Sequence, residues 1–182
     1  MGMALTVPRY TVDDLDHFPD DGNRYELLDG VLMVTPAPGG PHQGIAARFA
    51  MALGPQLWLP GRANIYTPGA ISFPPRTQLE PDVLVVPARF PIETPWVEIT
   101  EHWLAIEVFS RSSRVYDREF KRNAYLDLGV HEVWLVDMRE KCVEVCRVRG
   151  AGRIIRDVIT WRPPTLDFDV TVYLGVIFAG LS

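Results

Sequence analysis

The segments at residues 83–86 (VLVV) and 103–109 (WLAIEVF) constrain the fold of this chain more than any other feature. A strand with one face in water alternates apolar and polar residues, whereas these runs are largely apolar at successive positions. Such strands lie in the middle of a sheet that is covered on both faces. We therefore expect a central sheet with helices against it, and the 182-residue length fits one domain, 1–182, built around it.

The residues before this core predict a short helix and a hairpin. Thr11 can cap a helix that Pro19 stops, because its side-chain oxygen can accept a hydrogen bond from the first turn. Residues 24–34 contain two apolar runs separated by Asp29 and Gly30, a dipeptide that favours a tight turn with positive φ. A β-hairpin should therefore follow the helix.

Two longer helices are expected around the central strands. Apolar residues recur at helical spacing in the first of them, at Ile45, Phe49, Leu53 and Leu57. A further strand is predicted at residues 64–73. The second helix should run from a cap at Ser112 or Ser113 to about Leu128, with Gly129 at its C-terminal stop.

The residues after the second helix again have the pattern of strands, at 132–137, 142–148 and 154–161, with a short closing helix at 172–178. This order predicts an α/β fold of the mixed α+β kind. The central mixed sheet is flanked by helices, with an N-terminal hairpin and a C-terminal antiparallel strand extension.

Two acidic residues interrupt the apolar strands. Asp82 stands at the head of residues 83–86, and Glu107 lies inside the next apolar run. A carboxylate in a covered strand must be paired, bound to a cation or neutralised by a raised pKa. Each acid alone also fits a strand end that meets water or an arginine. Two adjacent strands that each offer one carboxylate can hold a hard divalent cation, Mg²⁺ or Mn²⁺.

Lys121 lies on the helix that follows the Glu107 strand, and from there it can reach the same site. The same position also allows an i,i+4 ion pair with Asp117 on the helix surface. The spacing does not choose between these two interpretations.

The formal net charge of −5 argues against a protein that coats nucleic acid non-specifically, so a nucleic-acid role requires a local basic patch. One basic cluster is present, and it consists of Arg111, Arg114, Arg118, Lys121 and Arg122. Asp117 and Glu119 lie among these residues, so a solvated helix face is the alternative interpretation.

Membrane, secretory and zinc-binding classes are not supported. The longest apolar stretch, residues 170–181, is shorter than the roughly 20 residues that cross a bilayer. The first twenty residues do not have the pattern of a secretory signal. Cys142 and Cys146 would lie about 13 Å apart on a strand, too far for a disulfide and without partners for zinc. We therefore expect a cytosolic (cytoplasmic) protein with reduced thiols.

Short motifs run through most of the chain. They are Tyr25-Glu-Leu-Leu-Asp-Gly30, Pro41-His-Gln43, Pro81-Asp-Val-Leu-Val-Val86, Ile106-Glu-Val-Phe-Ser110, Tyr116-Asp-Arg118 with Lys121 and Tyr125, Gly129-Val130 and Trp134-Leu-Val-Asp137. Together they resemble the Uma2 family, also described as a domain of unknown function, DUF820. This family is a branch of the PD-(D/E)XK nuclease superfamily, and the resemblance implies a restriction-endonuclease-like core.

One position departs from the superfamily pattern. A lysine is usual two residues after the glutamate of the third strand, and here that position is Phe109. Uma2-like sequences carry the lysine on the following helix, where Lys121 stands. The resemblance therefore implies a displaced lysine.

The resemblance also implies the roles of the site residues. Asp82 and Glu107 would bind the metal, with the carbonyl of Val108 as a third ligand. Lys121 would position the attacking water or stabilise the charge on the scissile phosphate.

Further candidates are less tightly defined. Glu26 and His42 match the family pattern as auxiliary ligands or proton carriers. The alternatives are a solvent-facing Glu26 and a His42 that caps or packs its helix. The arginines that would flank the metal as DNA contacts are Arg111, Arg114, Arg118 and Arg122.

The implied function is an Mg²⁺-dependent or Mn²⁺-dependent DNA endonuclease. A homodimer is expected because two symmetry-related sites cut both strands of a duplex most simply. One alternative is a catalytically inactive nucleic-acid- or protein-binding module that retains the fold. Another is hydrolysis of RNA or a nucleotide at the same centre.

Overall fold

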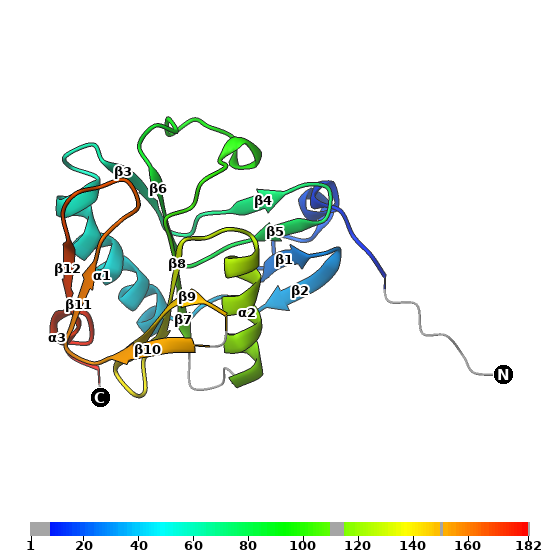
Figure 1. Cartoon of the computed structure of the whole chain (residues 1–182). Helices are drawn as coiled ribbons and strands as arrows, with labels where there is room; N and C mark the ends of the chain where they lie inside the picture. The colour runs from blue at the N-terminus through cyan, green and yellow to red at the C-terminus, as the bar shows by residue number, and fades with distance from the viewer. Residues whose placement is uncertain (1–7, 110–114, 150, 182) are drawn as a thin grey trace.

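A computed structural model describes residues 8–109, 115–149 and 151–181, apart from the side chains of residues 115–118 and 151. Its largest sheet has six strands, and they are β3 (Ala63–Tyr66), β6 (Val83–Pro87), β7 (Leu104–Phe109), β8 (Glu132–Asp137), β9 (Cys142–Val148) and β10 (Ala151–Ile155). Their order in the sheet is β10-β9-β8-β7-β6-β3 (Figure 1). The two strands with continuous apolar sequence, β6 and β7, lie inside the sheet, as predicted.

The six-stranded sheet is mixed. β7 and β8 pair in parallel, while the neighbouring pairs on either side are antiparallel. Parallel strands need a crossover connection, and α2 (Val115–Asp127) provides it between β7 and β8. Helix α2 therefore lies against the sheet over β8 and β9, and its Tyr125 side chain reaches Glu107 on β7.

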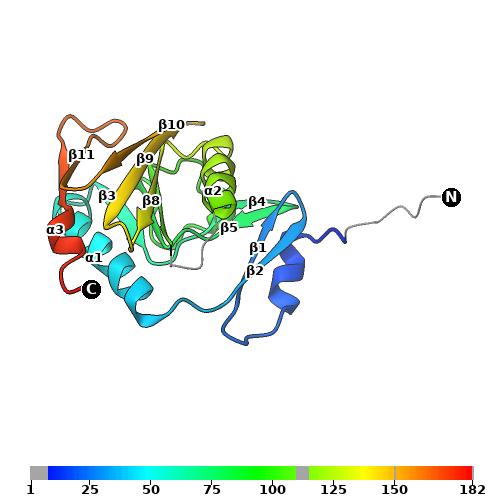
Figure 2. The ribbon, with the colours of Figure 1, turned by 90° about the horizontal axis from the view of Figure 1, so that it is seen from below.

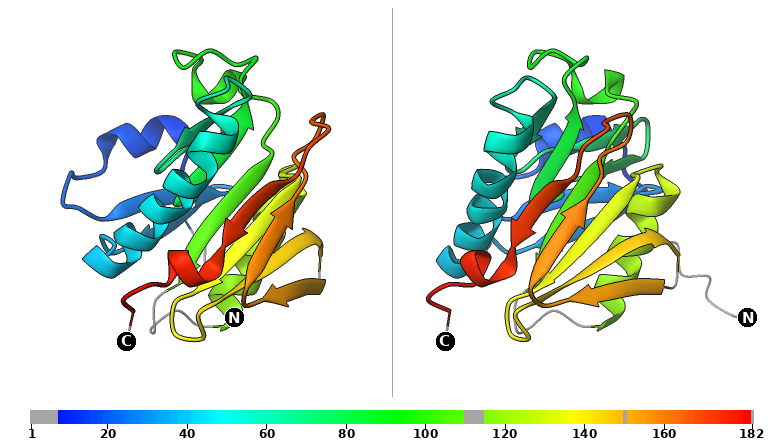
Figure 3. Two further views of the ribbon diagram at one scale, coloured as in Figure 1. Left: turned by 90° about the vertical axis from the view of Figure 1, so that its left-hand side faces the viewer. Right: turned by 60° about the vertical axis from the view of Figure 1, so that its left-hand side comes forward.

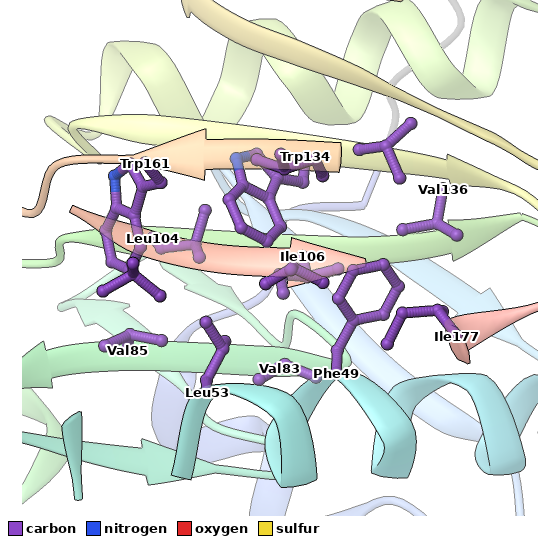
Figure 4. Close-up of a cluster of buried hydrophobic side chains, with 14 of the residues drawn as sticks. Phe49, Leu53, Val83, Val85, Leu104, Ile106, Trp134, Val136, Trp161 and Ile177 are labelled. Carbon is purple, nitrogen blue, oxygen red and sulfur yellow. The ribbon is translucent and has the colours of Figure 1, made fainter. Parts of the chain in front are cut away.

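One face of this sheet packs against a helix and a C-terminal hairpin. The elements on this face are α1 (Gly40–Leu57), β11 (Val158–Trp161), β12 (Val170–Tyr173) and α3 (Leu174–Ile177) (Figure 3). Their apolar side chains enclose Trp134 and Trp161 in what we call the α1-side core (Figure 4). The four apolar residues that predicted α1 are all buried there, at Ile45, Phe49, Leu53 and Leu57.

The opposite face is covered by α2 and by a second sheet (Figure 2). The strands of the second sheet are β1 (Arg24–Leu28), β2 (Val31–Thr35), β4 (Ile71–Phe73) and β5 (Thr77–Leu79), in the order β2-β1-β5-β4. Ile71, Leu79 and Tyr125 are among the residues of this α2-side core. The N-terminal hairpin is therefore half of a sheet that packs beside α2.

Two predicted strands are wrong in their extent. Residues 64–73 form β3 in the first sheet and β4 in the second, with Pro68 and Gly69 between them. A Cβ atom on Gly69 would lie 2.6 Å from the Cβ atom of Leu84, so the chain passes very close to β6 at this point. Residues 154–161 likewise divide into the end of β10 and all of β11, which belong to different sheets. β5 was not predicted, and the predicted closing helix at 172–178 begins too early, because residues 170–173 form β12 and α3 begins at Leu174.

The predicted turns and stops are confirmed. Asp29 and Gly30 have φ values of 50° and 79° in the β1–β2 turn. Thr11 precedes a short 3₁₀ helix, η1 (Val12–His17). Gly129 ends α2 with a φ of 85°, and the next residue donates its N–H to the Tyr125 carbonyl at 3.1 Å. The predicted serine cap of α2 lies outside the described residues.

Within the described residues, none of the helices has the length and apolar character that a membrane crossing would need. Cys142 and Cys146 are buried and are not joined by a disulfide.

Candidate functional site

A pocket of about 400 Å³ lies at the junction of the two sheets. Its walls come from β1, the segment between β2 and α1, the first turn of α1, the end of β7 and α2. The ionisable side chains that line it are Arg24, Glu26, His42, Asp82, Glu107 and Lys121. All five residues predicted as catalytic, Asp82, Glu107, Lys121, Glu26 and His42, are therefore in one cavity.

The pairing of β6 with β7 brings the two acids of the central strands together. These strands run antiparallel with Val83 opposite Ile106, so Asp82 faces Glu107 one residue further along. Residues two apart on a strand share a face, and the neighbours of both acids at that spacing pack in the α2-side core. The two carboxyl groups consequently project to the same side of the sheet, toward α2.

Asp82 is 4% exposed and its carboxylate is held from three directions. Its Oδ1 accepts a hydrogen bond from Arg24 Nη1 at 3.0 Å. Its Oδ2 lies 3.1 Å from His42 Nε2 and accepts the Val108 N–H at 2.8 Å. Burial alone would raise the pKa of Asp82, but the hydrogen bond and charge of His42 and the charge of Arg24 bring this pKa below its ordinary value. Asp82 is therefore an ionised carboxylate at neutral pH.

His42 is the reciprocal partner in this contact. Burial lowers the pKa of the imidazole, and the hydrogen bond and charge of Asp82 outweigh it, so the pKa rises above its ordinary value. The first turn of α1 thus directs its histidine at the pocket rather than only packing against the helix.

Glu107 is 6% exposed. Its Oε1 accepts a hydrogen bond from the Tyr125 hydroxyl and lies 3.4 Å from Lys121 Nζ. Burial raises the pKa of Glu107 to about 7; the charge of Lys121 opposes this rise, while the charges of Asp82 and Glu26 add to it. A cation beside Glu107 would relieve this repulsion between carboxylates.

Lys121 bridges the two sheets. Its Nζ lies 2.6 Å from each carboxylate oxygen of Glu26, which is 1% exposed. Burial lowers the pKa of Lys121, but the charges of Glu107 and Glu26 raise it above its ordinary value. The solvent-facing alternative for Glu26 is therefore wrong. The side chain of Asp117, the alternative partner of Lys121, is outside the described residues.

Of the four predicted DNA-contact arginines, Arg122 is the one whose side chain falls within the described residues. Arg122 is 6% exposed and its Nη1 lies 3.2 Å from Glu144 Oε1, on β9. Its guanidinium is held against the sheet by this ion pair and does not line the pocket, and its contact with DNA stays a prediction. Arg111, Arg114 and the side chain of Arg118 lie outside the described part of the chain.

Two residues that contact the pocket acids were not predicted as site residues, Arg24 beside Asp82 and Tyr125 beside Glu107. Helical spacing could have found Tyr125, because it lies one turn after Lys121 and so shares its face of α2. Strand alternation could have found Arg24, which shares a face of β1 with Glu26. Neither pattern identifies the acid that each residue contacts.

The donors at the pocket suit a hard cation. Among the described residues, no group of three or more His, Cys, Asp and Glu side chains is placed to hold a metal ion. Asp82 and Glu107 offer two carboxylates, and the backbone of Val108 adjoins Asp82. Mg²⁺ keeps several waters and needs only one or two protein carboxylates, so these residues fit such an ion.

Comparisons with known proteins agree with this description. The model of the Uma2 family, which is described as "Putative restriction endonuclease", matches residues 12–175. A solved structure of a protein from Anabaena variabilis, described as "a putative nuclease belonging to DUF820", superposes with a TM-score of 0.76. The two sequences are 19% identical, and the superposition covers 94% of this chain and 99% of that one. A search of curated proteins returned no match.

The structural likeness shows that the two chains share a fold. The family match covers most of the sequence, from the short N-terminal helix to the end of the last strand. It includes every described residue of the pocket. This chain belongs to the Uma2 family.

Proposed function

We propose that this protein is a divalent-metal-dependent endonuclease that hydrolyses phosphodiester bonds of DNA. The observation that carries the proposal is the convergence of Asp82, Glu107 and Lys121 on one pocket. The acids come from adjacent strands and the lysine from the next helix, although the lysine is displaced from the strand position that Phe109 occupies. The description of the family supports the same reaction class.

The pocket residues would have different roles in such a reaction. Asp82 and Glu107, with the Val108 carbonyl, would hold Mg²⁺ or Mn²⁺. When bound, this ion supplies charge neutralisation for the phosphate and lowers the pKa of its water. Arg24 and His42 orient the Asp82 carboxylate, and Tyr125 orients that of Glu107. The Lys121 ammonium offers a donor to the charge that develops on the phosphate.

Charge-removing substitutions of the same shape test this proposal. We expect the parent protein to cut supercoiled plasmid or linear duplex in Mg²⁺ or Mn²⁺ but not in EDTA. Asp82→Asn and Glu107→Gln should each lower the cutting rate by about 10²–10³-fold. Single strands and RNA tested in parallel would show whether DNA duplex is the preferred substrate.

Glu132→Gln is a matched control for these variants. Glu132 is 3% exposed and accepts a hydrogen bond from Trp134 Nε1 at 2.7 Å, on the face of the sheet opposite Glu107. This variant should cut at the parent rate. Equal cutting by the Asp82→Asn variant would refute the catalytic assignment, and metal binding without cutting of any substrate would favour a non-catalytic binding module.

We also propose that the protein acts on DNA as a homodimer, since a duplex has two strands to cut. Light scattering with and without a DNA duplex measures this. A strictly monomeric complex would count against paired cleavage.

A further inference from the structure

Lysine is rare in this chain. Of the 18 lysine and arginine residues, only Lys121 and Lys141 are lysines. Lys141 is exposed and donates to the Leu181 carbonyl at 2.7 Å, whereas the side chain of Lys121 is 14% exposed in the pocket. A lysine has a compact charge on a flexible stem, and so its position must be set by its partners.

The shortest contacts of Lys121 are with Glu26 rather than with Glu107. Both oxygens of Glu26 lie 2.6 Å from Nζ, while the approach to Glu107 is 3.4 Å. Glu26 Oε1 also accepts the Glu80 N–H at 2.8 Å, which ties the carboxylate to the backbone. Glu26 is thus itself fixed, from β1 and from the chain that leads into β6.

Glu107 has a separate anchor. The Tyr125 hydroxyl and Lys121 both contact its Oε1, so Oε2 is free of both groups. Since Glu26 takes the short contacts with the ammonium, the lysine stands beside Glu107 in a longer ion pair, at 3.4 Å. The Glu107 carboxylate and the Lys121 ammonium therefore each have a closer partner than one another, Tyr125 and Glu26.

We propose that Glu26 is a positioning residue of the hydrolytic site, which acts by holding the Lys121 ammonium beside Glu107. This proposal rests on the proposed function. A lysine on β7 would be fixed by the sheet, but a lysine on α2 must extend across the gap between helix and strand. The second sheet supplies the anchor that this displacement requires, and so its hairpin is part of the active site.

A double-mutant cycle tests whether Glu26 acts through Lys121. Glu26→Gln keeps the shape of the side chain and can still accept the Glu80 N–H. We expect it to lower kcat by about 10-fold to 10²-fold, with KM within about threefold of the parent value. Lys121→Gln should lower kcat at least as much, and the double variant should be no slower than Lys121→Gln alone. Multiplicative losses would overturn the proposal.

Calorimetric titration with Mn²⁺ separates positioning from metal ligation. Glu26→Gln should bind Mn²⁺ with the affinity of the parent, while Glu107→Gln should bind it at least about tenfold more weakly. A comparable loss in Glu26→Gln would make Glu26 a ligand and overturn the proposal.

A third measurement does not depend on cutting. With ¹³Cε-lysine incorporated, the NMR spectrum contains one signal from Lys121 and one from Lys141. Glu26→Gln should shift the Lys121 signal and increase its mobility, with Lys141 unchanged as the internal reference. Glu132→Gln should change neither signal.

An unaltered Lys121 signal in Glu26→Gln would overturn the positioning role even if the parent cuts DNA. If the parent cuts no substrate, the proposed hydrolytic function fails and so does the catalytic part of this proposal. A shifted Lys121 signal would then identify the Glu26–Lys121 contact as structural.

Discussion

Two histidines show how strongly a neighbouring carboxylate changes the pKa of an ionisable residue. His42 meets Asp82, and its pKa is raised. His102 is 1% exposed, and its Nε2 has no hydrogen-bond partner within the described residues. Burial lowers the pKa of His102 to about 4; the charge of Glu101 opposes this shift and the charge of His131 adds to it. The imidazole of His102 is therefore neutral in the fold, while that of His42 is stabilised in its charged form.

The depressed pKa of His102 predicts a loss of stability in acid. The unfolded chain protonates this residue near pH 6.5, whereas the folded chain does so only near pH 4. Its contribution is thus fully present above pH 6.5 and is lost as the pH falls through 4. As the pH falls through this window, the free energy of unfolding of the His102→Leu variant should rise relative to that of the parent, by on the order of 1–3 kcal/mol at pH 4. Urea unfolding from pH 7 to pH 4 measures the difference, and a difference independent of pH would contradict it.

Elements differ in how far the sequence predicts them. The α1 face, the Asp29-Gly30 turn and the covered strands β6 and β7 follow from local patterns. The second sheet does not, because β4 and β5 have three residues each and β5 pairs with β1 across a long stretch of sequence. The same limit holds for the site. Sequence patterns identify its acids and its lysine, but they do not show that Lys121 pairs with Glu26.

The close approach of the chain to β6 between β3 and β4 predicts that a substitution at Gly69 will destabilise the fold. Gly69→Ala would place a Cβ atom 2.6 Å from the Leu84 Cβ, and neither can move away without displacing β4 or β6. We expect a loss of about 1–3 kcal/mol in the free energy of unfolding. Gly54→Ala, in α1, meets nothing within 4 Å and should be neutral or stabilising by up to about 1 kcal/mol. Equal stability of the two variants in urea would disprove the close approach.

At the scale of the whole molecule, the pocket joins parts that pack in different layers. Arg24 and Glu26 come from the second sheet, Asp82 and Glu107 from the central sheet, and Lys121 from α2. The segment between β2 and α1 leads from the second sheet to the opposite layer and lines the same cavity (Figure 2). A ligand bound there contacts every layer and should therefore stabilise the folded chain globally.

Thermal unfolding with and without Mn²⁺ measures this effect. An ion that binds only the folded state at 100 times its Kd adds about 2.7 kcal/mol of stability, which corresponds to a Tm increase of roughly 5–10 °C for a chain of this length. EDTA should reverse the increase, and it should be absent from a variant that carries both Asp82→Asn and Glu107→Gln. A similar increase in that variant would place the ion elsewhere.

The interval of 95 residues between Glu26 and Lys121 also matters while the protein is being synthesised. At translation rates of about 5–20 residues per second, the ribosome needs roughly 5–20 s to proceed from one residue to the other. During that time Glu26 is present without its lysine, and Glu107 is added only 14 residues before Lys121. The pocket can therefore be completed only after Lys121 has been synthesised, so the site cannot form on a nascent chain that carries only the hairpin and the central strands β6 and β7.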